Sequence, residues 1–217
     1  MRHQRGNPIN RTIPLWLKIT FTAWVSVWAI VYTVFYGPQN FLWLCNLCNF
    51  ILLVGLWTEN RLLVSSQIVA VLFIDLLWSI DLMTALLSGH HPFGGTAYMF
   101  NGEIPFTVRL MSLYHVFTPP LLLFSVFRLG YSRRGLLLQT LITWVLFPAT
   151  YLLTDPERNV NWVHGAFGTT GLEMPPLAWI LILMAACPLL LYLPTHGLVI
   201  FLCRRFRCEA TGDGAIT

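Results

Sequence analysis

The residues of this sequence best suited to chemistry are a cysteine, an aspartate and a histidine in three consecutive apolar stretches. At the 1.5 Å rise of an α-helix, Cys45, Asp81 and His115 lie roughly 6, 9 and 10 Å from the same end of their stretches. A thiol, an imidazole and a carboxylate are the groups of a nucleophilic triad, in which the histidine activates the thiol and the acid orients the histidine. We therefore predict Cys45, His115 and Asp81 as catalytic residues at a shared depth.

Polar side chains accompany this trio at helical spacing. An amide lies four residues after Cys45, on the same helix face, and a second amide follows Cys45 directly. Hydroxyl groups lie three residues before and three residues after His115. We predict that these groups bind a substrate and that one of the amides donates to an oxyanion. They are Asn46, Asn49, Ser112 and Thr118.

Two consecutive prolines follow the histidine. Pro119 and Pro120 remove the hydrogen bonds normally accepted by the carbonyls of His115 and Val116. We expect the helix to be opened or kinked there, and the freed carbonyls to find other partners.

A second carboxylate lies deeper in the same stretch as Asp81. Asp75 is nearly two helical turns away from Asp81 and about 120° around the helix. We expect Asp75 to pair with an asparagine, with Gln139 or with a buried water, outside the catalytic cluster. A proton relay is the alternative role for it.

The elements that carry these residues are membrane spans, because the composition excludes the other classes of protein. Of the 217 residues, 56% are hydrophobic and only 10% are charged, and the mean hydropathy is +0.67. A soluble domain carries about 25% charged residues. The composition therefore excludes a soluble domain, a disordered chain and a nucleic-acid-binding protein, although the net charge is +4.

Six stretches are long and apolar enough to cross a bilayer, which requires roughly 17 to 25 residues. We predict an all-α, polytopic transmembrane helix bundle in which residues 1–217 form a single integral membrane domain. The spans are approximately 14–36, 41–57, 63–87, 108–127, 136–154 and 176–203.

The basic residues predict the orientation of this bundle. Six spans place eleven of the 13 basic residues on one side, and the positive-inside rule makes that side cytoplasmic. We therefore expect both termini in the cytoplasm. The arginines near the C-terminus could instead contact anionic lipids. The eleven residues are Arg2, Arg5, Arg11, Lys18, Arg61, Arg128, Arg133, Arg134, Arg204, Arg205 and Arg207.

The two longest loops, 88–107 and 155–175, lie on the opposite side in this topology. Loops of such length commonly act as lids or binding segments. We predict that Asn161 and His164, from the second loop, also bind the substrate.

Metal and cofactor binding are not predicted. No helix carries a metal-binding pair of histidines, and neither a phosphate-binding glycine loop nor a dinucleotide motif occurs. The cysteines show no disulfide framework, since Cys203 and Cys208 fall on the reducing side. The expected partners are membrane lipids.

Three segments resemble YwaF-like bacterial six-span membrane proteins. Phe41-Leu-Trp-Leu-Cys45-Asn46-Leu-Cys48-Asn49 is similar to a Leu-x-Leu-Cys-Asn segment of that family, and Tyr114-His115, after Arg109, to its histidine span. Asn159-Val-Asn161-Trp162, followed by Leu172-Glu-Met-Pro-Pro-Leu-Ala-Trp179, is similar to its loop into the last span.

The resemblance implies a location in a bacterial inner membrane and a chemistry. Eukaryotic relatives of that family include a membrane acyltransferase that uses Cys and His, which would correspond to Cys45 and His115. More distant kin, the androgen-induced hydrolases of hydroxy-fatty-acid esters, use Thr and His, and this chain has Trp43 near the Thr position.

We therefore expect a lipid acyl-ester hydrolase or acyltransferase with a Cys/His site in the outer third of the bilayer. The alternatives are a non-enzymatic bundle that binds a lipid or a partner, and a proton-coupled transporter that depends on Asp75.

Overall fold

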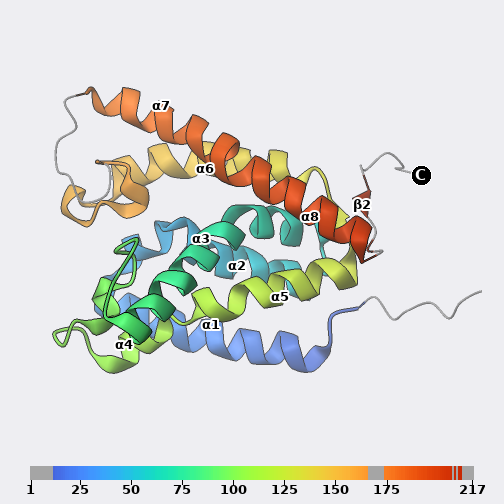
Figure 1. Ribbon diagram of the computed structural model, residues 1–217, viewed down its shortest axis with the longest axis horizontal. Helices are drawn as coiled ribbons and strands as arrows, with labels where there is room; N and C mark the ends of the chain where they lie inside the picture. Colours follow the sequence, from blue (N-terminus) through green and yellow to red (C-terminus); the bar gives the residue numbers. More distant parts are fainter. Residues whose placement is uncertain (1–11, 166–173, 207, 209, 212–217) are drawn as a thin grey trace, which may run out of the picture.

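The computed structural model describes residues 12–165, 174–206, 208 and 210–211 of the chain, and nearly all of its regular structure is helical (Figure 1). The α-helices are α1 (Leu15–Tyr36), α2 (Leu44–Trp57), α3 (Arg61–Ser88), α4 (Phe106–Met111), α5 (Tyr114–Leu129), α6 (Gly135–Leu153), α7 (Pro176–Ala186) and α8 (Leu193–Arg205). The shorter elements are η1 (Pro38–Leu42), η2 (Ala97–Phe100), η3 (Pro156–Arg158), η4 (Val160–Trp162), the π-helical η5 (Cys187–Tyr192), and the strands β1 (Tyr131–Ser132) and β2 (Ala210–Thr211).

The predicted helical bundle is confirmed, with five candidate membrane spans among the described residues. They are Leu15–Tyr36, Arg61–Ser88, Phe106–Leu129, Gly135–Leu153 and Pro176–Arg205. These bounds agree with five of the six predicted stretches. The sixth, α2, has 14 residues and is roughly 21 Å long, which is shorter than a hydrocarbon core of about 30 Å. A sixth span and cytoplasmic termini therefore stay predictions.

The longest single helix, α3, forms the centre of the bundle. It packs against α2, α5, α6 and α8, and half of its residues are buried. Asn60 caps its start, because the Asn60 side chain accepts hydrogen bonds from the backbone of Leu62 and Leu63. A helix enclosed by four others is where ionisable side chains can be kept away from lipid.

Helix α6 approaches α3 very closely at a glycine. A Cβ atom added at Gly135 would lie 2.8 Å from the backbone carbon of Ser65. Only a residue without a side chain fits there, which explains the glycine at the start of α6.

The two ends of the bundle differ in character. The loop that follows α3, together with η3 and η4, lies at the left of Figure 1, whereas the end of α8 and strand β2 lie at the right. Basic side chains lie toward the right-hand end. Lys18 pairs there with Glu59 at 2.7 Å, and Arg128 donates to the carbonyl of Thr12. Four of the predicted cytoplasmic arginines, Arg2, Arg5, Arg11 and Arg207, lie outside the described residues, as do residues 166–173 of the second long loop.

The prediction that no cysteines are paired is wrong. Cys203 and Cys208 form a disulfide, with their Cα atoms 4.6 Å apart. They meet because the chain turns back after α8, so that β2 can pair with β1. Cys45, Cys48 and Cys187 are free.

Candidate active site

The chemical centre of the bundle is a buried histidine paired with an aspartate. His115 Nδ1 lies 2.7 Å from Asp75 Oδ1, and the two side chains come from α5 and α3. Trp78 stacks on the His115 ring with centroids 4.7 Å apart. His115 is 7% exposed and Asp75 is fully buried. The imidazole is therefore held in one orientation by an acid at one nitrogen and an aromatic face.

The predicted partner of His115 was Asp81, and this prediction is wrong. Both carboxylate oxygens of Asp81 accept hydrogen bonds from the loop that follows α3, from the backbone of Phe93 and from both the backbone and the hydroxyl of Thr96. This loop folds back over the end of α3. Both oxygens of the carboxylate that was predicted to orient His115 are therefore hydrogen-bonded to the loop instead.

The prediction for Asp75 is wrong for a related reason. It was expected to lie too deep to join the cluster, with the depth of His115 counted from Val108. The helix begins at Phe106, is interrupted between α4 and α5, and places His115 level with Asp75 instead.

Cys45 completes the group. It is half-buried in the first turn of α2, and its thiol lies beside the His115 and Tyr114 side chains, but within the described residues it makes no hydrogen bond to either of them. Because His115 Nδ1 faces Asp75, the other ring nitrogen, Nε2, is the one left for the thiol. The structure thus places Cys45 near His115 and pairs His115 with Asp75, and the catalytic pairing of Cys45 with His115 stays a prediction.

The start of α2 offers two backbone donors beside the thiol. The N-cap residue Trp43 gives no side-chain hydrogen bond, and the Leu44 amide donates to Asn161 Oδ1 at 2.9 Å. The amides of Cys45 and Asn46 have no acceptor within the described residues. Free amides at a helix start favour an anion, through hydrogen bonds and through the helix dipole.

Three tyrosine hydroxyls lie around this centre, and none of them was predicted as a site residue. Tyr32 Oη lies 2.7 Å from Ser112 Oγ, and Tyr98 from η2 lies beside Ser112. Tyr114 donates to Asn46 Oδ1 at 2.6 Å. Burial raises the pKa of Tyr98, so its hydroxyl stays protonated and can donate. The available signal was that Tyr32 and Tyr114 lie inside predicted apolar spans, whereas Tyr98 lies in a loop.

Two of the predicted substrate-binding residues have polar atoms to spare. Asn49 Oδ1 and Thr118 Oγ1 are buried without a hydrogen-bond partner among the described residues, as is Asp75 Oδ2. The Asn46 side chain accepts from Tyr114 and donates to the carbonyl of Asn40. Asn46 therefore positions Tyr114, and its predicted role as an oxyanion donor stays a prediction.

The two residues predicted from the second long loop have different positions. Asn161 contacts the site indirectly, because its side chain binds Leu44 N and the carbonyl of Leu42 and so fixes the start of α2. His164 instead stacks on Tyr151 of α6, with ring centroids 4.7 Å apart. The structure thus brings Asn161 next to Cys45 and leaves His164 elsewhere.

The carbonyl freed by Pro119 has found a partner, as expected. Ser79 Oγ of α3 lies 3.3 Å from the carbonyl oxygen of His115, and 2.7 Å from that of Asp75. Helix α5 continues through both prolines. The freed backbone group therefore ties the histidine to the helix that carries its aspartate.

No group of three or more His, Cys, Asp or Glu side chains suited to a metal ion occurs within residues 12–165 and 174–206. The site is built from a thiol, an imidazole, one carboxylate and neutral hydroxyl and amide groups. Such a set suits acyl transfer through a covalent thioester.

Comparison of the chain with protein-family models, with curated proteins and with solved structures finds no match. The class that the structure itself defines is an all-α bundle with helices long and apolar enough to cross a membrane.

Proposed function

We propose that this protein is an intramembrane acyl-ester hydrolase or acyltransferase in which Cys45 is the nucleophile, His115 the general base and acid, and Asp75 the residue that orients the histidine. The observation that carries the proposal is the 2.7 Å contact between Asp75 Oδ1 and His115 Nδ1, with the Cys45 thiol beside the same imidazole. This is the order of acid, base and nucleophile in a catalytic triad.

The reaction proceeds in two balanced steps. The Cys45 thiol gives its proton to His115 Nε2, and the sulfur attacks the acyl carbonyl carbon of an ester. The tetrahedral adduct collapses, the carbon–oxygen bond of the ester breaks, and the leaving alcohol takes the proton from His115. Water, or an acceptor alcohol, then loses a proton to His115, and its oxygen attacks the thioester carbon. The carbon–sulfur bond breaks, the acyl group leaves as a carboxylic acid or as a new ester, and the sulfur takes the proton back from His115.

The amides of Cys45 and Asn46 are the proposed donors to the oxyanion. They lie in the same helical turn as the attacking sulfur, and fixed backbone donors need no reorganisation when negative charge develops on the carbonyl oxygen. Asn161, which binds the preceding amide at Leu44, would hold this turn in place.

The proposed substrate is a lipid ester, because the helices around the site are apolar enough to lie in a bilayer. The resemblance of the Cys45 and His115 segments to YwaF-like proteins and their acyltransferase relatives agrees with this choice. A non-enzymatic, lipid-binding bundle is the competing function, and thiol reactivity separates the two.

The first experiment measures ester hydrolysis by the purified protein with p-nitrophenyl octanoate in detergent micelles. We expect Cys45→Ala and His115→Ala each to lose at least about 10³-fold in kcat/KM, since members of a triad act as a unit. Cys187→Ala is the matched control, because Cys187 is also free and half-buried. Full activity in Cys45→Ala would exclude the mechanism.

The second experiment measures alkylation of the same protein by a maleimide. We expect Cys45 to react faster than Cys187, and His115→Ala to abolish the difference, because the base that generates the thiolate has been removed. Equal, slow labelling of both cysteines in the wild-type protein would favour the non-enzymatic bundle.

A further inference from the structure

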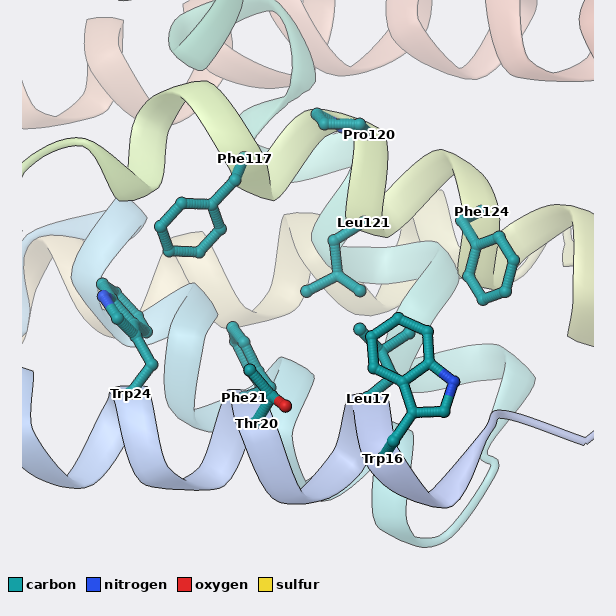
Figure 2. A pocket seen from close by; sticks show the side chains of 9 residues that line it. All are labelled: Trp16, Leu17, Thr20, Phe21, Trp24, Phe117, Pro120, Leu121 and Phe124. Atoms are coloured by element: carbon teal, nitrogen blue, oxygen red, sulfur yellow. The ribbon is translucent and has the colours of Figure 1, made fainter.

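A long apolar groove lies between α1 and α5, on the side of the bundle away from α6, α7 and α8 (Figures 1 and 2). Its volume is about 450 Å³, and aromatic and aliphatic side chains from both helices line it. Thr20 supplies the only hydroxyl among these lining side chains. The groove is separate from the cluster around Cys45, and nothing in the proposed reaction uses it.

One end of the groove is closed. The rings of Trp24 and Phe117 meet edge to face across it, with centroids 4.8 Å apart. The Trp24 ring also contacts the Tyr114 ring, with centroids 5.8 Å apart. Figure 2 shows these two rings facing each other at the end of the row. Tyr114 belongs to the candidate active site, so the closure separates the groove from that site.

The other end carries a cation. Phe124 and Trp16 line it, and the Arg128 guanidinium carbon lies over the Phe124 ring at 5.7 Å. Arg128 donates only to the carbonyl of Thr12, and no carboxylate pairs with it within the described residues. Glu59, a carboxylate near this end among the described residues, is already paired with Lys18.

The length of the groove fits part of a single leaflet. From Phe117 to Phe124, α5 advances seven residues, which is roughly 10 Å along the helix. Half of a hydrocarbon core is roughly 15 Å thick. The groove thus begins at a cation near the basic end of the bundle and ends inside the apolar layer.

We propose that this groove binds one acyl chain of an anionic glycerophospholipid whose phosphate pairs with Arg128. The chain lies between α1 and α5 and ends against Trp24 and Phe117. Charge complementarity selects the lipid, because Arg128 presents an uncompensated positive charge where the headgroup would sit. The proposal does not depend on the chemistry of Cys45.

The test uses the full chain in vesicles that contain a phospholipid with a photoreactive diazirine near the end of one acyl chain. The headgroup is either phosphatidylglycerol or phosphatidylcholine, and cross-linked peptides are located by mass spectrometry. We expect labelling concentrated on residues 16–24 and 117–124, with the phosphatidylglycerol probe labelling at least fivefold more than the other. We expect Thr20→Phe, which fills the groove from its exposed side, to reduce this labelling at least fivefold.

Matched variants separate the groove from general contact with lipid. Val145→Phe adds the same ring to a position on α6 that is 73% exposed, and it should leave the labelling unchanged. Arg128→Gln should remove the preference for phosphatidylglycerol, whereas Arg205→Gln, whose arginine lies over Phe206, should keep it.

Three results would overturn the proposal. They are labelling spread evenly over α1, α5, α6 and α7, labelling that Thr20→Phe leaves intact, and a cross-link to a second protein chain on this groove. If Thr20→Phe fails to fold, Leu121→Phe narrows the same groove from α5, and the same three results apply to it.

Discussion

Two aspartates on α3, six residues apart and both fully buried, have opposite surroundings. Asp81 accepts three hydrogen bonds of 2.6 to 2.8 Å from the loop that covers it, and both of its oxygens are used. Asp75 has one oxygen on His115, while the other has no partner among the described residues. Hydrogen bonds therefore occupy both carboxylate oxygens of Asp81 but only one carboxylate oxygen of Asp75.

This difference separates a structural carboxylate from a chemical one. Leaving a buried polar atom unpaired costs free energy, so protein structures rarely do it without a reason. Asp81 bonds mainly to backbone amides and therefore fixes a loop. Asp75 bonds to an imidazole that lies beside a thiol, and its second oxygen has no hydrogen-bond partner within the described residues.

The largest effect is expected from Asp75→Asn. The amide has the same shape, so the thermal midpoint should change little, but it no longer fixes the histidine tautomer that accepts the thiol proton. We expect hydrolysis of p-nitrophenyl octanoate to fall about 10³- to 10⁴-fold, as in serine-protease triads. If Asp75→Asn keeps its activity, the aspartate does not orient His115 in catalysis.

The sequence predicted which elements form better than it predicted how they meet. Five span boundaries agree with the structure to within a few residues, because apolar length decides them. Cys45 and His115 were found because a thiol and an imidazole are conspicuous inside apolar stretches. The structure places the two residues near each other, and their catalytic pairing stays a prediction.

The choice between the two aspartates could not be made from the sequence. It depended on the loop that folds back onto Asp81 and on the interruption between α4 and α5, and both are tertiary features. The helical periodicity of the sequence predicts the face of α3 on which Asp75 lies. Which helix packs against that face is known only from the tertiary structure. The tyrosine hydroxyls were missed for the same reason.

The next effect in size is that of Asp81→Ala on stability. The substitution removes three hydrogen bonds to a charged group and leaves the amides of Phe93 and Thr96 without their acceptor. Such bonds contribute about 1.5 to 3 kcal/mol each, so for three bonds we expect a loss of about 4.5 kcal/mol or more. The thermal midpoint in detergent and proteolysis of the loop at residues 89–105 measure it. An unchanged midpoint would mean that the loop is held by other contacts.

A smaller version of the same test is Thr96→Val. The valine keeps the shape and the backbone amide but removes the hydroxyl that donates to Asp81 at 2.6 Å. We expect a loss of about 1.5 to 3 kcal/mol, the value for one bond to a charged acceptor. Thr84→Val is the control, because that hydroxyl is exposed and bonds only within its own helix. Equal midpoints for the two variants would contradict the structural role of Asp81.

The smallest effect is expected at Glu59, a partly exposed carboxylate at the basic end of the bundle. The hydrogen bond from Lys18, helped by the amide of Ile13, lowers the pKa of Glu59 below its ordinary value of 4.5. A carboxyl whose pKa is lower in the folded state stabilises the fold above its unfolded-state pKa, and this contribution is lost as the pH falls through the folded-state pKa.

Glu59→Gln removes that dependence. Between pH 7 and pH 3 the wild-type midpoint should therefore fall more than that of the variant, by the equivalent of at most about 1 kcal/mol, because the pair is partly exposed. Glu103→Gln, at an exposed carboxylate without an ion pair among the described residues, is the control and should follow the wild type. High salt should shrink the difference for Glu59. The loop that Asp81 holds should be insensitive to salt, since its hydrogen bonds are shielded from solvent.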